Sequence, residues 1–166
     1  MVRPAHKEDF SKIYTVNELA FKQHDEAQLV ERLRKSQEYI MELEFVAIKD
    51  HQIVGHILYT TVQIGHHVCR AVALAPMSVL PTFQNQGIGA SIIRHTLQEV
   101  NRLGYSSVIV LGHPNYYPRF GFRPASNWGI QFHQDVPDDV FMALSFDTNG
   151  LNGISGIVKY SDAFDL

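Results

Sequence analysis

Hydrophobic positions recur at helical spacing in three stretches of the chain. The first predicts a helix over residues 10–21, with Asp9 as its N-cap and an apolar stripe of Ile13, Val16, Leu19 and Ala20. The second predicts a helix over residues 26–36, with Leu29, Val30 and Leu33 on one face and charged residues on the other. The third begins at Ile88, and Gly104 stands where a C′ glycine belongs.

Between these helices the pattern is typical of strands. We expect a short strand at residues 1–3, stopped by Pro4, and long strands in the runs FVAIKD, IVGHILYTTVQIG and AVALAPMSVL, with a turn at Asp50-His51. The run YSSVIVL (105–111) predicts a buried strand. The rest predicts a short helix or turn at 116–120, a strand after Phe122, and strands within residues 140–146 and 154–160.

The order strand, glycine loop, helix, strand around residues 71–111 predicts one βαβ crossover. The two strands of such a unit are parallel. The remaining strands follow one another closely along the chain, which favours antiparallel pairing. The order of elements therefore predicts an α+β or α/β fold with a mixed sheet, in a single domain over residues 1–166.

Composition narrows the functional classes. Of 166 residues, 45% are apolar and 19% charged, which supports a folded core. The net charge of −3 gives no support for nucleic-acid binding. The first residues carry charges where a signal peptide needs an apolar run, and no apolar stretch reaches the length of a membrane span. With a single cysteine, Cys69, we expect a soluble cytoplasmic protein without membrane partners.

The stretch FQNQGIG (83–89) predicts an anion-binding loop. Gly87 and Gly89 allow a tight turn, and the helix that follows presents main-chain N–H groups with no intrahelical partner. The loop lacks the lysine of a P-loop, and Ile92 occupies the third glycine position of a dinucleotide fingerprint. What remains is the pattern Q-x-x-G-x-G, from Gln84 to Gly89.

Two motifs carry a resemblance to a known family. The stretch from Gln84 to Gly89, with MSVLP before it and a long helix after it, resembles the acyl-CoA pyrophosphate loop of the GNAT superfamily of N-acetyltransferases. YYPRFGF (116–122) is similar to that superfamily's Y-x-x-x-G-F segment, with Tyr117 and Gly121 in register. The whole pattern is most similar to the YhbS-like branch of predicted acetyltransferases within the superfamily.

The resemblance implies an α+β fold, layered α/β/α, with a mixed and mostly antiparallel sheet. It also implies a cosubstrate, acetyl-CoA, bound in a cleft where the one parallel strand pair splays apart. Its pyrophosphate would lie over the loop amides, and its pantetheine arm would pair with the first strand. The positions that this assigns to cofactor binding are Met77, Ser78, Val79, Gln84, Asn85, Gln86, Gly87, Ile88, Gly89, Ala90 and Asn115. Gln84 would brace the loop, and no metal is required.

The resemblance also implies two catalytic groups. The Val79 amide would stabilise the oxyanion formed when an amine attacks the thioester. The hydroxyl of Tyr117 would protonate the leaving thiolate, and Tyr116 is the alternative if the YYP segment is one residue out of register. Pro114 and Pro118 bracket residues 115–117 and shorten the helix that the family has before this motif. Three residues, Glu44, Glu42 and His113, remain open as general base, and a chain of water molecules is a further alternative.

The expected function is therefore transfer of an acetyl group to a primary amine, on a small molecule or a protein. In the family the acceptor pocket includes the connection of the first two helices, here residues 21–28. The resemblance therefore implies that His24 and Glu26 lie near the acceptor pocket. The alternative is an acyl-CoA-binding protein that no longer catalyses transfer. Relatives often form dimers, so a homodimer is one expectation. The cluster His66, His67 and Cys69 favours a turn over a metal site, because no second ligand pair accompanies it.

Overall fold

The computed structural model describes all residues, 1–166, and is built around a nine-stranded sheet. The main path through the sheet is β1-β2-β3-β4-β5-β8-β6, while β9 pairs with β3 and β7. The strands are β1 (Val2–Pro4), β2 (Tyr39–Lys49), β3 (Gln52–Ile64), β4 (Ala71–Val79), β5 (Ser107–Leu111), β6 (Arg123–Pro124), β7 (Ile130–Gln131), β8 (Phe141–Ser145) and β9 (Gly156–Lys159). Along the main path only β4 and β5 are parallel, which confirms the predicted crossover.

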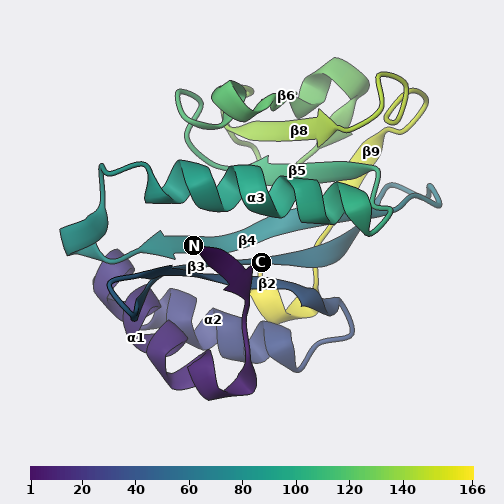
Figure 1. Cartoon of the computed structure of the whole chain (residues 1–166). Coiled ribbons are helices and arrows are strands. Elements are labelled where there is room, and N and C mark those ends of the chain that lie inside the picture. The colour runs from purple at the N-terminus through teal and green to yellow at the C-terminus, as the bar shows by residue number, and fades with distance from the viewer.

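Helices cover both faces of the sheet (Figure 1). The long helix α3 (Ile88–Arg102) lies across one face, while α1 (Phe10–Phe21) and α2 (Asp25–Arg34) lie against the other. Short 3₁₀ helices complete the connections, among them η2 (Pro81–Phe83), η3 (Tyr117–Phe120) and η4 (Ala125–Trp128). The mixed, layered α+β architecture predicted from the sequence is confirmed. None of the helices combines the length and the apolar character that crossing a bilayer requires.

Three hydrophobic clusters follow from this layering. Helix α3 buries Ile92, Ile93, Leu97 and Val100 against the sheet, as its periodicity predicts. Helices α1 and α2 bury Ile13, Val30 and Leu33 against β2, β3 and β4. The segments after Phe122 cover the rest of that second face, where Ile109 of β5 meets Phe141 and Val158. The sheet is thus enclosed on both sides, and its internal strands read as near-continuous apolar runs.

Several boundaries differ from the sequence prediction. Strand β2 begins at Tyr39, not Phe45, so Glu42 and Glu44 lie within it and not ahead of it. Asp9 does precede α1, but its carboxylate makes no cap bond to that helix. It accepts instead from the Arg3 guanidinium and the His6 N–H, both at 2.7 Å. The ion pair and the tight turn before α1 compete for the carboxylate that we expected to cap the helix.

The two ends of α3 differ in whether side chains bond their free main-chain groups. At its C-terminus Gly104 adopts φ = +91°, as predicted, and the Arg70 guanidinium donates to the carbonyl oxygens of Gly104 and Leu103 at 2.9 and 3.2 Å. Those bonds supply partners to carbonyls that the helix itself leaves free. At the N-terminus no side chain caps the helix, and no acidic residue occupies its first turn.

Candidate active site

The parallel strand pair opens along part of its length. β4 and β5 pair at Ala71, Val72 and Ala73, and the last partner of β4 on that side is Ile109. β4 nevertheless continues to Val79, and β5 to Leu111. The stretch 74–79 of β4 therefore has a main-chain edge without a strand partner on this side.

The register of β4 with β3 decides which main-chain groups face that open edge. The Leu80 N–H donates to the Val54 oxygen at 2.8 Å, so the groups of Leu80 face β3. Main-chain groups alternate in direction along a strand. Those of Ser78 therefore also face β3, while those of Met77 and Val79 face the opening.

The glycine loop presents a run of free donors at the end of this edge. The main-chain N–H groups of residues 85–90 make no hydrogen bond within the protein. Gly87 takes φ = +82°, a conformation that side chains disfavour. A Cβ on Gly89 would lie 3.0 Å from the Tyr116 hydroxyl and 3.7 Å from Met77 Cε, inside the hollow of the loop. Together with the dipole of α3, these donors suit a diphosphate.

Side chains brace the loop from outside. As predicted for a bracing residue, Gln84 donates from Nε2 to the Val79 oxygen at 3.0 Å. The Gln86 side chain donates to the Thr82 oxygen and accepts from Lys49 Nζ at 3.0 Å, so it points away from the hollow. Because these side-chain bonds hold the loop without using its N–H groups, the donors stay available to a ligand.

A cleft of about 760 Å³ joins these parts. Its walls come from the end of α1, the end of β4, the glycine loop and the segment after β5. The lining residues are Ala20, Phe21, Met77, Ser78, Val79, Phe83, Gln84, Asn85, Gly87, Ile88, Gly89, Ala90, His113, Tyr116 and Arg119. The Ser78 hydroxyl has no hydrogen-bond partner, and the residue is only 4% exposed. A buried hydroxyl without a partner costs about 1–3 kcal/mol, which a ligand or water in the cleft would recover.

The two tyrosines of the YYPRFGF segment occupy different places. The Tyr116 hydroxyl lies at the glycine loop, and its ring lines the cleft. Tyr117 does not line the open cleft: its ring packs against Phe122 and over Gly112, where a Cβ would collide with the ring. Gly112 directly follows β5, so Tyr117 lies at the side of the opening that β5 forms. Burial raises the pKa of the Tyr117 hydroxyl to about 12, so it is protonated at neutral pH.

A model of the acetyltransferase (GNAT) domain matches residues 1–125. The chain belongs to the GNAT acetyltransferase family. It is 29% identical over 147 residues to the uncharacterized N-acetyltransferase YhbS of Escherichia coli, covering 88% of this chain and 87% of that protein. It is 34% identical over 136 residues to the uncharacterized N-acetyltransferase YjhQ of the same organism, covering 80% and 75%.

Two solved GNAT structures are similar along nearly their whole length. The crystal structure of E. coli YhbS in complex with CoA has a TM-score of 0.93 and 27% identity, covering all of this chain and 92% of that one. A GNAT acetyltransferase from Brucella melitensis in complex with acetyl-CoA has a TM-score of 0.82 and 31% identity, covering 99% and 97%. The free N–H groups and the hollow over Gly89 give this chain a site that fits such a ligand.

Some predicted site residues lie away from the cleft. Asn115 is exposed in the turn before η3 and does not line it. His24 pairs with Glu18, and Glu26 accepts from Gln23, so neither points into the GNAT cleft. The lining residues that sequence reasoning missed are Ala20 and Phe83, which carry no chemical signal in the sequence.

Of the three candidates for general base, only His113 lines the cleft. Glu42 is exposed on β2, and Glu44 is fully buried. The Glu44 carboxylate accepts from Arg34 at 2.6 Å, from the Tyr39 hydroxyl at 2.6 Å and from His56 Nε2 at 2.8 Å. Glu44 therefore has a structural role in this fold.

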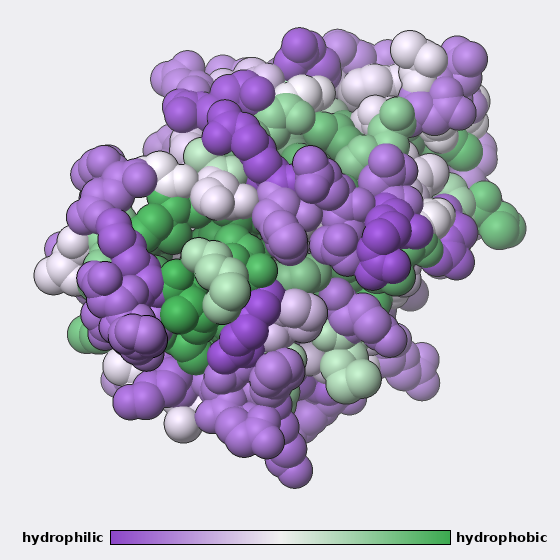
Figure 2. Space-filling view, in the orientation of Figure 1, coloured by the Kyte–Doolittle hydropathy of each residue, from purple (hydrophilic) through white to green (hydrophobic).

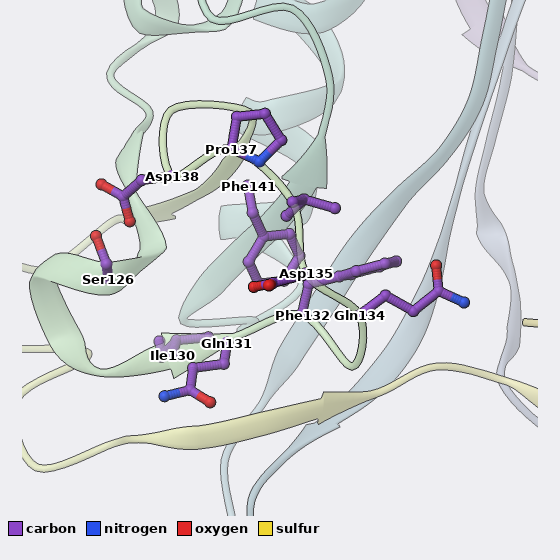
Figure 3. Close-up of a pocket in the computed structure, with 10 residues that line it drawn as sticks. Ser126, Ile130, Gln131, Phe132, Gln134, Asp135, Pro137, Asp138 and Phe141 are labelled. Atoms are coloured by element: carbon purple, nitrogen blue, oxygen red, sulfur yellow. The ribbon is translucent and has the colours of Figure 1, made fainter.

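A smaller cavity of about 160 Å³ lies between η4, β7 and the loop before β8 (Figure 3). Phe132 and Phe141 contribute apolar walls, and the carboxylates of Asp135 and Asp138 are among its polar groups. It shares no lining residue with the main cleft.

Proposed function

We propose that this protein transfers an acetyl group from acetyl-CoA to a primary amine by direct attack, without a covalent enzyme intermediate. One observation carries the proposal: free main-chain donors run from the start of α3 to the open edge of β4. The loop N–H groups would hold the diphosphate, and the edge at Met77 and Val79 would pair with the pantetheine arm. The arm would then bring the thioester into the opening between β4 and β5.

At that point Val79 is the proposed oxyanion donor. When the neutral amine attacks the thioester carbon, the carbonyl oxygen gains negative charge, and the Val79 N–H would donate a hydrogen bond to it. The Met77 N–H faces the same side and is the neighbouring donor. Such preorganised donors typically contribute about 100- to 1,000-fold in rate. The Ser78 main-chain groups face β3, so its contact with a ligand would use the free hydroxyl.

Tyr117 is the proposed general acid. As the tetrahedral intermediate collapses, the C–S bond breaks and the thiolate takes the proton of the Tyr117 hydroxyl. Its place beside Gly112, at the β5 side of the opening, supports this role. Tyr116 fits it less well, because its hydroxyl lies at the loop that would hold the phosphates. His113, the one histidine that lines the cleft, is the proposed acceptor of the amine's proton.

The direct test is incubation of the protein with acetyl-CoA and a panel of primary amines, following thiol release. We expect turnover with at least one amine, and a rate that rises with pH as the acceptor amine loses its proton. Binding of acetyl-CoA without turnover on any amine would favour the alternative of an acyl-CoA-binding protein. A thermal-shift comparison of CoA, ATP and NAD gives a second reading, because only a ligand of the folded state raises the midpoint.

A further inference from the structure

Two arginines beside the cleft lack an acidic partner. Arg119 lines the cleft, and its guanidinium carbon lies 4.6 Å from the centre of the Tyr116 ring. Arg94 of α3 lies 5.2 Å from the centre of the Phe120 ring. The two rings contact each other edge to face at 5.3 Å, so both guanidinium groups are held on one aromatic cluster.

The other arginines of the chain use their donors within the protein. Arg3, Arg34 and Arg102 each pair with a carboxylate. Arg32, Arg70 and Arg123 donate to main-chain oxygens, and Arg70 also lies over the Tyr105 ring. Arg94 makes no hydrogen bond and no ion pair, and Arg119 uses only Nε, to donate to the Tyr116 oxygen at 3.0 Å. Stacking on an aromatic face fixes a guanidinium while its N–H edge stays free for an anion. The structure thus holds two oriented, unneutralised cations next to the glycine loop.

Both arginines lie close to the glycine loop. Arg94 follows Ala90 by one helical turn on the same face of α3, which is about 6 Å along the axis. Burial raises the pKa of the Tyr116 hydroxyl, and the charges of Arg119 and Arg94 act in the opposite direction. Both cations therefore lie within electrostatic reach of the hydroxyl that stands over Gly89. The loop N–H groups already suffice for a diphosphate, so these cations are available to a further anionic group.

We propose that Arg119 and Arg94 bind the 3′-phosphate on the ribose of coenzyme A, so that the cleft selects CoA over 3′-dephospho-CoA. The inference rests on the proposed function, because it requires the cleft to bind CoA. The 3′-phosphate is the one anionic group of CoA outside its diphosphate. Guanidinium groups bind phosphate oxygens through paired N–H donors, which suits two arginines with free edges.

The test is calorimetric titration of the protein with CoA and with 3′-dephospho-CoA. We expect the wild type to bind CoA about tenfold more tightly, and Arg119→Ala and Arg94→Ala each to lower CoA affinity while leaving affinity for dephospho-CoA unchanged. Arg119→Lys should keep part of the preference, since it keeps the charge. Arg102→Ala is the matched control: it lies on the same helix, pairs with Glu99, and should change neither affinity.

The affinity for dephospho-CoA also shows whether a substitution has damaged the rest of the cleft. If Arg119→Ala or Arg94→Ala weakens both ligands equally, or if the wild type binds both equally well, the assignment of the 3′-phosphate is overturned while the proposed function stands. If the wild type binds neither ligand, both fail. Competition by 3′,5′-ADP that exceeds competition by 5′-ADP, and that is lost in the two variants, would give independent support.

Discussion

Polar groups are arranged in contrasting ways in two regions of this protein, the buried cluster around Glu44 and the cleft. Beneath α1 and α2, the Glu44 carboxylate is bound by Arg34, Tyr39 and His56, and Asn17 Nδ2 bonds His56 Nδ1 at 3.2 Å. At the cleft, the N–H groups of residues 85–90, the Ser78 hydroxyl and the Arg94 guanidinium have no partner in the protein. The Glu44 carboxylate is neutralised within the protein, although the buried Asn17 Oδ1 beside it has no partner. The donors at the cleft are instead left free for a ligand.

The contrast separates stability from function. A buried charge that loses its partner is costly, so the Glu44 cluster should respond to mutation through unfolding. The cleft groups are bonded to little else, so changing them should cost ligand affinity or rate and leave the fold intact. On the face that carries α3, Figure 2 shows hydrophobic residues gathered in one region and bordered by hydrophilic ones.

Glu44→Gln should have the largest effect. The substitution keeps the side-chain volume but leaves the Arg34 charge, with only 11% of its side chain exposed, without a counter-ion. We expect the free energy of unfolding to fall by about 3–5 kcal/mol in urea titration. Glu99→Gln, which removes the partner of the exposed Arg102, is the control and should leave the free energy of unfolding unchanged. Equal effects of the two would contradict a structural role for Glu44.

Tyr117→Phe should reduce turnover by about 100- to 1,000-fold while CoA affinity stays the same, because only proton donation to the thiolate is lost. The measurement is kcat with an amine that the panel identifies, beside calorimetric CoA binding. Tyr116→Phe is the matched comparison, one residue away in the same segment. A large loss of kcat in Tyr116→Phe with an intact rate in Tyr117→Phe would reverse the assignment.

Gly89→Val should lower CoA affinity by about 100-fold, which is about 2.7 kcal/mol, because its side chain fills the hollow beneath the Tyr116 hydroxyl. Stability should change little, since this glycine has ordinary helical geometry. Ser91→Val introduces the same side chain two residues along α3, outside the cleft, and should bind CoA normally. Full affinity in Gly89→Val would place the phosphates elsewhere.

The smallest effect is a dependence of stability on pH. Burial lowers the pKa of His56 below its ordinary value of 6.5. The unfolded chain therefore binds a proton that the folded state does not, so stability falls as the pH drops below about 6.5, by at most about 1.4 kcal/mol per pH unit. His56→Gln, which can still donate to Glu44, should flatten that slope. If the free energy of unfolding changes equally with pH in the wild type and in His56→Gln between pH 7 and 5, the role of His56 is contradicted.

At lower pH the protonation of the Glu44 carboxylate determines how stability depends on pH. Its bonds to His56 and Arg34 outweigh burial and lower its pKa to about 2. A group with a depressed pKa stabilises the fold above its ordinary pKa, and this contribution is lost as the pH falls from about 4.5 toward 2. Glu44→Gln should lack that second decline.

Sequence reasoning located the features that periodicity and glycine chemistry encode. The spacing of Ile88, Ile92 and Leu97 gave α3, and the loop glycines gave the free donors. Which donors of β4 face the opening depends on register with β3, including an irregularity between Ile57 and Tyr59, and no local pattern reports that. The role of Glu44 depends on four elements meeting in three dimensions. The positions of Tyr116 and Tyr117 depend on Gly112, whose missing Cβ admits the Tyr117 ring.

The most direct test of the central claim, that main-chain donors at the start of α3 hold the diphosphate, is a titration of ¹⁵N-labelled protein with CoA followed by NMR. We expect the largest amide shifts in residues 85–90, with further shifts at Met77 and Val79. Shifts of that size only elsewhere, with the loop amides unmoved at saturating CoA, would contradict the account.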